Sequence, residues 1–600
     1  MTLSFADWLI VAAYFALSLV IGLVFTGRAG RSLAEYFVSG RSLPWWLAGT
    51  SMVATTFAAD TPLVVTGLVA KYGVAGNWLW WNLALSGILT VFFFARLWRR
   101  AGVLTDVELV ELRYGGRPAA VLRGTRALYL ALPINLIIMG WVTRAMQTIL
   151  EVTLGISGWS VPIILFVMTA GYVILAGLWG VIVTDFFQFL IAMGGSIVLA
   201  VLAVDHIGGL DRLVSAAAAH FGSEQTAVGI LPPLDGGWLP LSSLLVFLAV
   251  QWWAAWYPGA EPGGGGYVAQ RILSSKDERH GLLATLWFNI AHYALRPWPW
   301  ILVALFAAVT YPDLANPEDG YVRAMVDLLP SPLKGLLLAA FAAAYMSTIA
   351  THLNWGTSYL VNDVWLRFLH RGGGRDAARD ERRLVLVSRV ATVVLMLLAL
   401  VVMSFLHTVE SGWRLLLAIG AGTGPVLILR WYWWRINAWS ELVAMGASFV
   451  TALSLQYVWG LRPADETATD FALVMLLTVG VTTVAWVVTT FLTRPESDAA
   501  LERFYRRVRP GGPGWRAVAG RLGFAADRIP GGALSWLNWV AGWLAVYGTL
   551  FGIGQLLVGT VGRAAAFLGA AALLFALVAR NLRHDKSFRS ETVDSAAPPA

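Results

Sequence analysis

The stretch AYMSTIATHLNWGTSYLVND, residues 344–363, places hydroxyl, imidazole and amide side chains inside a long apolar run. Ser347 and Thr348 are adjacent hydroxyls, and Ala344 lies one helical turn before them. Buried hydroxyls in a lipid-spanning helix are costly unless a partner satisfies them. The pair either bonds back to its own helix or supplies neutral oxygens to a cation. A weakly held, releasable sodium ion fits the second interpretation.

A helix break earlier in the chain offers further oxygens for such a site. The stretch TTFAADTPLVVTG places Asp60, Pro62 and Gly67 inside the apolar run 45–70. Because proline donates no amide hydrogen and interrupts the helix before it, backbone carbonyls near Ala58–Thr61 are expected to lose their helical partners. Unwound carbonyls and helix ends at the bilayer midplane coordinate coupling ions in many transporters.

A second break, WYPGAEPGGGGY, lies within the apolar run 240–265 and indicates where a solute binds. Its carboxylate, Glu261, can hydrogen-bond a hydroxyl or pair with an amine. Arg296 lies in mid-span, where a guanidinium needs a partner. That partner is Glu261, Asp60 or a substrate carboxylate held in bidentate fashion. The predicted substrate or gate residues are Glu261, Tyr257, Trp256, Arg296 and Asn354.

The composition requires that these groups lie in a membrane. Mean hydropathy is +0.68, hydrophobic residues make up 58% of the 600 residues, and charged residues only 13%, about half the soluble norm of roughly 25%. The absence of cysteine excludes disulfides and thiolate metal sites. Net charge +8 is assigned to the orientation of membrane helices and not to nucleic-acid binding.

Apolar runs of about 20 residues, enough to cross the hydrocarbon, recur along the whole chain. They predict an all-α polytopic protein with fifteen spans and with its termini on opposite sides. The spans are 5–26, 45–70, 78–98, 124–150, 159–178, 181–204, 240–265, 282–308, 332–364, 386–406, 411–430, 437–458, 469–492, 535–556 and 562–580.

The two breaks divide these spans into two halves. Each broken span opens a run of five, and the two enter the membrane from opposite sides, which indicates an inverted repeat of five plus five helices. One helix precedes this core and four follow it. The expected divisions are 1–44, the first repeat 45–204, an extracellular loop 205–239, the second repeat 240–431, two helices 432–492, a basic amphipathic segment 493–534, two C-terminal helices 535–580 and a polar tail 581–600.

The positive-inside rule orients the bundle. If the loop after the first helix is cytoplasmic, 34 of the 43 Lys and Arg residues fall in cytoplasmic segments, among them Arg271. We therefore expect a multi-pass protein of the cell's inner (plasma) membrane, with the N-terminus outside and the C-terminus in the cytoplasm. The basic segment 493–534, which carries spaced aromatics, is expected to form a short amphipathic helix on the anionic leaflet.

Six motifs in order make the chain resemble the sodium:solute symporter family, which includes sodium–glucose, proline and sialic-acid cotransporters. The resemblance covers about residues 5–492 and implies a LeuT-like fold. The motifs are YFVSGRSLPWW (36–46), TDVELVELRYG (105–115), YVILAGLWGVIVTDFFQ (172–188), YVAQRILSSK (267–276), AAAYMSTIATHLNWGTSYLVND (342–363) and LRWYWWRIN (429–437).

The resemblance also implies a sodium site between the first broken helix and the helix of residues 332–364. Its ligands would be the carbonyls of Ala58, Thr61 and Ala344 and the hydroxyls of Ser347 and Thr348. Asp185 matches an acid on the ion's exit path or at a second sodium site, where Thr351 would contribute and where Ala350 replaces a hydroxyl. A helix N-terminal acid is the alternative interpretation of Asp185, and Asp60 matches a polar position near the ion.

The function expected from the sequence is sodium-coupled symport of a small organic solute by alternating access. A sugar, amino acid, carboxylate or amine remains open as the solute. Proton coupling in the same fold is the alternative, since Asp60, Glu261 and His352 can titrate, and a transporter-like membrane sensor is a second. An ATP-driven pump would need a nucleotide site, and the sequence has no GxxxxGK[ST] motif. A membrane enzyme would need a converging nucleophile, base or metal cluster, and the sequence shows none.

Overall fold

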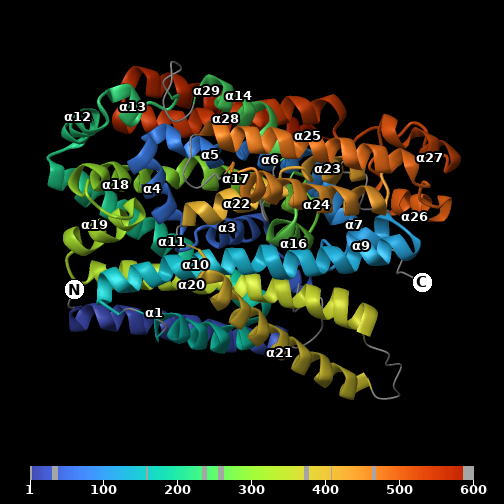
Figure 1. Ribbon diagram of the computed structural model, residues 1–600, viewed down its shortest axis with the longest axis horizontal. Helices are drawn as coiled ribbons and strands as arrows, with labels where there is room; N and C mark the ends of the chain where they lie inside the picture. Colours follow the sequence, from blue (N-terminus) through green and yellow to red (C-terminus); the bar gives the residue numbers. More distant parts are fainter. Residues whose placement is uncertain are drawn as a thin grey trace.

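Long helices that run in nearly the same direction dominate the computed structural model, and many of them are bent or interrupted (Figure 1). The structure describes residues 3–29, 38–156, 158, 160–232, 240–254, 262–369, 377–406, 409–461 and 468–585. Within these ranges it contains ten helices long and apolar enough to cross a membrane, or twelve if each of two bent pairs is one span. The protein is therefore a multi-pass helical membrane protein.

The described helices follow one another without a sheet. Up to residue 207 they are α1 (Phe5–Ala29), α3 (Trp45–Thr56), α4 (Thr61–Tyr72), α5 (Trp78–Trp81), α6 (Ala84–Leu89), η3 (Thr90–Phe94), α7 (Ala95–Ala101), α8 (Leu109–Arg113), α9 (Gly116–Tyr129), η4 (Leu130–Ile134), α10 (Asn135–Leu154) and α11 (Ser160–Ile207). From residue 210 to 369 they are α12 (Leu210–Phe221), α13 (Glu224–Val228), α14 (Leu241–Val246), η5 (Phe247–Gln251), α15 (Trp252–Ala254), α16 (Gly266–Ser274), α17 (Glu278–Ile290), η6 (Ala291–Leu295), α18 (Pro297–Thr310), η7 (Pro317–Asp319), α19 (Gly320–Leu328), α20 (Leu333–Ser358) and η8 (Tyr359–Leu369).

The remaining helices lie in the C-terminal third. They are α21 (Ala377–Met403), α22 (Val409–Gly420), α23 (Gly424–Tyr432), α24 (Ala438–Leu453), η9 (Ser454–Val458), α25 (Ala468–Leu492), α26 (Asp498–Val508), α27 (Arg516–Arg521), α28 (Gly532–Val558) and α29 (Val561–His584).

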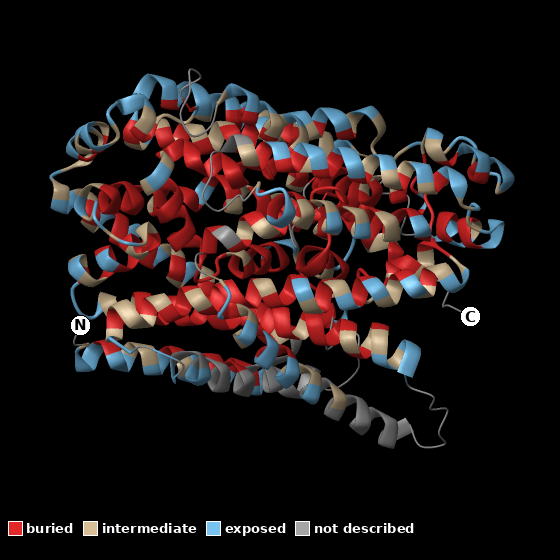
Figure 2. Cartoon of the chain, viewed as in Figure 1, coloured by how far each residue is buried: buried red, intermediate tan, exposed pale blue. Residues whose placement is uncertain are grey.

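Burial sorts the helices into an interior and a lipid-facing shell. Buried residues fill the middle of the molecule, whereas exposed residues line its outer helices (Figure 2). In α20 94% of the apolar window is buried, but in α1 only 22% and in α29 only 17%. Helices that expose apolar side chains on this scale belong at the boundary with lipid, and α20 forms the core.

The predicted break in the first core helix is confirmed. Helix α3 ends at Thr56, α4 begins at Thr61, and the two are bent by 57°. Pro62 stands at the start of α4, where its missing amide hydrogen costs nothing. Carbonyls at the end of α3 are therefore left for partners outside the helix.

The second predicted break, WYPGAEPGGGGY, is only partly within the described residues. Residues 255–261 lie outside the described ranges, but Gly263 and Gly264 have φ values of +89° and +79°, which favour glycine. The chain then re-enters a helix, α16, in which most residues are buried. Placing Arg271 in a cytoplasmic loop was therefore wrong, because this arginine lies fully buried in α16 and is compensated by an acid.

A third break was not predicted. The single span expected over 411–430 is two helices, α22 and α23, bent by 46° at residues 421–423. Gly422 fits tightly here, since a Cβ on it would meet the Thr482 hydroxyl at 2.2 Å. The glycines of this stretch carried the signal, but the surrounding apolar run hid it.

The two spans predicted as 159–178 and 181–204 form one element. The structure has a single helix, α11, of 48 residues, without a loop at residues 179–180. Apolar length alone had suggested the division, and the stretch contains no proline between them. Asp185 consequently lies inside α11, so its interpretation as an N-terminal acid of a helix is also wrong.

The basic segment 493–534 packs on protein. Its helix α26 buries Leu501, Phe504, Tyr505 and Val508. The Arg113 guanidinium stacks over Phe504 with 5.3 Å to the ring centroid. The apolar face that the sequence assigned to the lipid leaflet is therefore covered by other parts of the chain.

Different helices lie at the two ends of the molecule (Figure 1). The N-terminus lies at the same end as α12, α13 and α19, whereas the C-terminus lies at the opposite end with α26 and α27 (Figure 1).

Candidate ion and solute site

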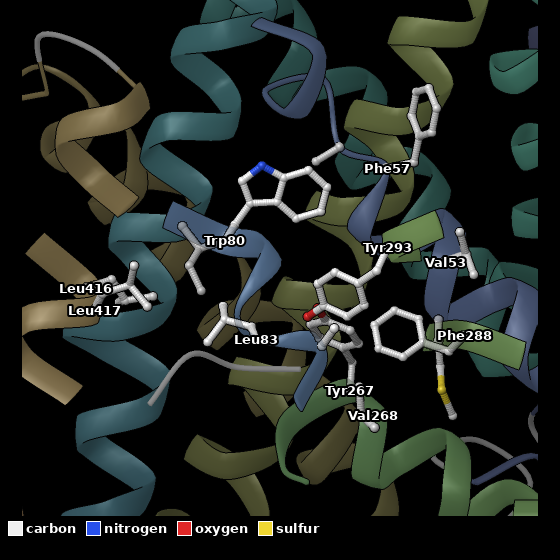
Figure 3. Packing of buried hydrophobic residues seen from close by; sticks show 14 of the residues in the cluster. Val53, Phe57, Trp80, Leu83, Tyr267, Val268, Phe288, Tyr293, Leu416 and Leu417 are labelled. Carbon is white, nitrogen blue, oxygen red and sulfur yellow. The ribbon is translucent and has the colours of Figure 1, made fainter. Parts of the chain in front are cut away.

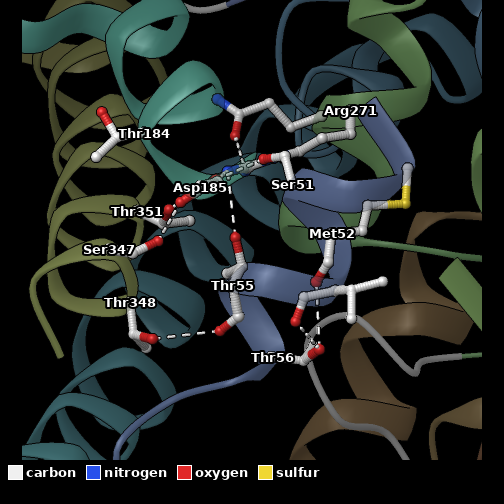
Figure 4. Close-up of polar contacts among 12 residues, drawn as sticks. Ser51, Met52, Thr55, Thr56, Thr184, Asp185, Arg271, Ser347, Thr348 and Thr351 are labelled. Atoms are coloured by element: carbon white, nitrogen blue, oxygen red, sulfur yellow. Dashed lines mark hydrogen bonds and ion pairs between the residues drawn. The ribbon is translucent and has the colours of Figure 1, made fainter. Parts of the chain in front are cut away.

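The hydroxyl of Thr348 joins α20 to the end of α3. It donates to the carbonyl of Thr55 at 3.2 Å and to the carbonyl of Ala344, one turn earlier, at 2.9 Å (Figure 4). All three residues are at least 96% buried. Thr348 therefore bonds back to its own helix, which is the first of the two interpretations that the sequence left open. It also brings neutral oxygens of α20 and of the end of α3 close together.

Ser347 points to a different partner. Its hydroxyl donates to the carboxylate of Asp185, whose second oxygen accepts from the Ser51 hydroxyl at 2.6 Å (Figure 4). Arg271 lies 3.8 Å from the same carboxylate. One acid from α11 therefore links α3, α16 and α20.

Arg271 extends this network toward the Thr348 region. Its guanidinium lies 3.4 Å from the Thr55 hydroxyl and 3.3 Å from the Thr351 hydroxyl. Burying a charge this deeply is tolerable only because Asp185 neutralises it and hydroxyls satisfy its N–H groups. The sequence had singled out Asp185 and Thr351 but not Arg271, Ser51 or Thr55.

The break residues that the sequence assigned to sodium lie close by. The Thr61 amide donates to the Ala58 carbonyl at 3.3 Å, and both residues line the cavity that Thr348 also lines. The carbonyl that contacts the Thr348 hydroxyl is nevertheless that of Thr55. Thr61 opens α4, so its carbonyl faces the hydrogen-bond ladder of that helix.

A cavity of about 60 Å³ lies beside these oxygens. Its wall is largely aromatic: Trp80, Tyr267, Phe288 and Tyr293 converge on it from four different helical segments (Figure 3). Trp80 and Tyr293 stack with 5.9 Å between ring centroids. The described lining residues are Thr55, Thr56, Ala58, Asp60, Thr61, Trp80, Leu83, Ile138, Trp141, Val142, Tyr267, Phe288, His292, Tyr293, Arg296, Thr348, His352, Trp413 and Leu417.

Two charged groups face this cavity. Asp60, in the break between α3 and α4, accepts from the indole of Trp413 at 3.2 Å. Arg296 donates to the Val53 carbonyl at 3.2 Å and to the Thr56 hydroxyl at 3.0 Å. The described residues include no ion pair between Asp60 and Arg296, so that pairing, one of those the sequence allowed, is not made.

The other predicted solute residues are not brought to the cavity by the described structure. Glu261, Tyr257 and Trp256 lie outside the described residues. Asn354 is half-buried in α20 and is not among the described residues that line the cavity. His292 and His352 serve as hydrogen-bond partners, of Thr56 at 3.0 Å and of Asn135 at 2.7 Å.

A membrane-spanning helical bundle in which broken helices meet at a buried cavity is typical of secondary transporters. The comparison with known proteins identifies the family. The model of the sodium:solute symporter family matches residues 36–447, and the chain belongs to that family. This confirms the family resemblance and with it sodium as the coupling ion and sodium-coupled symport as the activity.

Two of the relatives are named as sodium/glucose cotransporters. The chain is 26% identical to sodium/glucose cotransporter 4 of Danio rerio over 509 residues, which cover 78% of this chain and 74% of the relative. It is also 26% identical to a sodium/glucose cotransporter of Vibrio parahaemolyticus over 488 residues, or 76% and 86% of the two chains.

Among solved structures, a substrate-bound, outward-open Na⁺-coupled sialic acid symporter superposes with a TM-score of 0.65. The match has 18% identity and covers 82% of this chain and 99% of the other. At this identity the likeness concerns the fold, and it confirms the LeuT-like class.

Proposed function

We propose that this chain couples the entry of a small organic solute to one sodium ion held between α3 and α20. The contact that carries the proposal is the Thr348 hydroxyl on the Thr55 carbonyl, with the Ala344 carbonyl beside it. The Ser347 hydroxyl and the break carbonyls of Ala58 and Thr61 are the remaining candidate ligands. All of these oxygens are neutral, which suits an ion that must be released.

The shared lining explains how ion and solute become coupled. Thr348, Ala58 and Thr61 line the cavity together with Asp60 and Arg296. An ion that fixes α3 and α4 relative to α20 therefore also fixes one wall of the solute cavity. Two ligands that favour the same arrangement of one set of helices strengthen each other's binding.

A second sodium site at Asp185 and Thr351 is disfavoured by Arg271. The guanidinium lies 3.8 Å from the Asp185 carboxylate and 3.3 Å from the Thr351 hydroxyl, so a cation there would meet a positive charge. Asp185 instead positions Ser347, its hydrogen-bond donor.

The test separates sodium from proton coupling. Thermal unfolding of the purified full chain is measured in NaCl and in KCl at equal ionic strength, at several pH values. Sodium coupling requires a higher Tm in NaCl at every pH. A Tm that follows pH and is the same in both salts contradicts the proposal.

A further inference from the structure

One buried carboxylate in the cavity has a free oxygen. Asp60 is only 2% exposed, and its Oδ2 accepts from the Trp413 indole at 3.2 Å. Its Oδ1 has no hydrogen-bond partner within the part of the chain that the structure describes. An unsatisfied carboxylate oxygen at such depth is costly, and this cost indicates that a ligand supplies the missing partner.

The sodium site does not explain this oxygen. The candidate ligands beside Thr348 are hydroxyls and carbonyls, and Thr348 bonds to Thr55 and Ala344 without involving Asp60. Arg296 directs its Nη1 to the Val53 carbonyl and the Thr56 hydroxyl. The positive charge of Arg296 does act on the Asp60 carboxylate, but no group of the described residues donates a hydrogen bond to Oδ1. This oxygen is therefore open to a hydrogen-bond-donating partner in the cavity.

The surroundings select among such partners. Three indoles line the cavity: Trp80 from α5, Trp141 from α10 and Trp413 from α22, together with Tyr267 and Tyr293. Aromatic rings around a carboxylate suit a cationic nitrogen, whose charge they stabilise and whose methylene or methyl groups they cover.

A bound sugar would need many hydrogen-bond donors and acceptors in the cavity wall. Each of its hydroxyls requires a donor and an acceptor, because a buried polar group left unpaired is penalised. The described lining residues include no asparagine, glutamine, serine, glutamate or lysine. Apart from threonine and tyrosine hydroxyls, its polar groups are Asp60, Arg296 and the side chains of two histidines and three tryptophans.

We propose that the cavity binds a small solute with a positively charged nitrogen, either an amine or a zwitterion, and that the Asp60 carboxylate is its counter-ion. This inference rests on the proposed transport function, whose cavity it uses. It assigns a solute class that differs from the sugars in the names of the curated relatives.

The experiment uses paired probes on the purified full chain. Choline is compared with 3,3-dimethyl-1-butanol, an uncharged molecule of nearly the same shape, and L-proline, glycine betaine and D-glucose complete the set. Each probe is titrated in NaCl while Tm is recorded. At least one of the three nitrogen cations or zwitterions should raise Tm at saturation, and 3,3-dimethyl-1-butanol and D-glucose should not.

Variants locate the effect. Asp60→Asn should raise the half-saturating probe concentration at least tenfold, whereas Asp211→Asn, at an exposed acid in α12, should leave it unchanged. If Asp60→Asn does not fold, the wild-type comparison of choline with its neutral counterpart still decides. A shift from D-glucose alone, no shift from any of the three charged probes, or an undiminished shift in Asp60→Asn would overturn the inference.

The proposed sodium site and the proposed solute class can be contradicted separately. The difference in Tm between NaCl and KCl without any probe tests the sodium site, and it should persist in Asp60→Asn. If that difference is missing in the wild type, the proposed coupling fails whatever the probes do. If it is present while the charged probes are inert, only the solute class is wrong.

Discussion

Glu318 contacts two of the broken helices. Its carboxylate accepts from the backbone amides of Val409 at 3.2 Å and Glu410 at 3.1 Å, at the start of α22. A Cβ on Gly67 of α4 would lie 2.9 Å from the Glu318 side chain. One acid on a short loop helix thus contacts one half of each of two broken helices.

Burial disfavours the ionised form of the Glu318 carboxyl group. Burial raises the pKa of Glu318 to about 7, the two amide hydrogen bonds oppose that rise, and the neighbouring Glu410 charge adds to it. Glu410 itself is paired with Lys71 of α4 at 2.8 Å and with Arg414 of α22 at 2.6 Å. These surroundings therefore favour a protonated Glu318.

This predicts a pH dependence of stability. Because the folded pKa lies above the unfolded value, the folded state binds more protons, so the stabilisation is complete below about pH 4.5 and is lost as pH rises through 7. The span corresponds to on the order of 3 kcal/mol. Wild-type Tm should therefore rise relative to that of Glu318→Gln as pH falls from 7 to 4.5.

Calorimetry or intrinsic fluorescence across this range measures the difference. Glu224→Gln, at an exposed acid in α13, is the control and should track the wild type. A Tm difference between wild type and Glu318→Gln that is constant with pH would show that Glu318 is not titrating there.

At the residue scale, the sequence predicted single groups better than their partners. Ser347, Thr348 and Asp185 were expected near an ion, and the structure brings them into one region. Arg271 was missed because its motif reads as a basic loop. Only the tertiary structure shows that it pairs with Asp185, 86 residues earlier in the chain.

The helix pair α28 and α29 is an element to which the sequence assigned no function. Hydrogen bonds between side chains and backbone carbonyls hold α28 against the interior helices. Tyr547 donates to the Trp81 carbonyl at 2.9 Å, and the Trp298 indole donates to the Leu550 carbonyl at 2.8 Å. These contacts reach α5, which lines the cavity with Trp80, and α18, which begins directly after the cavity residue Arg296. The pair is thus tied to the helices nearest the cavity, on the side of the molecule away from α1 (Figure 1).

A glycine tests how closely this pair is packed. A Cβ on Gly554 of α28 would lie 2.0 Å from the Trp298 ring, so Gly554→Ala should overpack the contact and destabilise by about 1–3 kcal/mol. Gly569→Ala on α29 has nothing within 4 Å and should be neutral or stabilising, because alanine favours the helix.

Thermal unfolding of the two variants beside the wild type measures the contrast. If Gly554→Ala and Gly569→Ala unfold at the same temperature, α28 is not fitted against Trp298 as the structure shows.

At the element scale, breakers with a strong chemical signature were predictable and others were not. Pro62 marked the break between α3 and α4 correctly. Gly263 and Gly264, which the sequence also singled out, have positive φ values directly before α16. The break at residues 421–423 was missed because its glycines sit in an apolar run long enough to be one span. The division of α11 was predicted wrongly because hydropathy reports length and not where a helix ends.

At the scale of the whole molecule, the sequence predicted the class, and the family match confirms it. The orientation in the membrane remains our proposal: the end with α12, α13 and the N-terminus faces outward, and the end with α26 and α27 faces the cytoplasm. The excess of Lys and Arg at the second end supports this.

Cysteine labelling tests the orientation in a chain that has no native cysteine. Ser223→Cys and Ala525→Cys place one exposed thiol at each end. An impermeant maleimide should label the first in intact cells and the second only after permeabilisation. Equal labelling, or the reverse order, would refute the assignment.

The central claim is that sodium binds where Thr348 of α20 meets the end of α3. Equilibrium binding of radioactive sodium to the purified full chain measures this directly. The account predicts saturable binding that Thr348→Ala weakens by about tenfold, if the lost ligand is worth on the order of 1.4 kcal/mol. Thr357→Ala, two turns farther along the same helix with its hydroxyl 3.0 Å from that of Thr392, should bind sodium as the wild type does. Absence of saturable binding, or wild-type affinity in Thr348→Ala, would contradict the account.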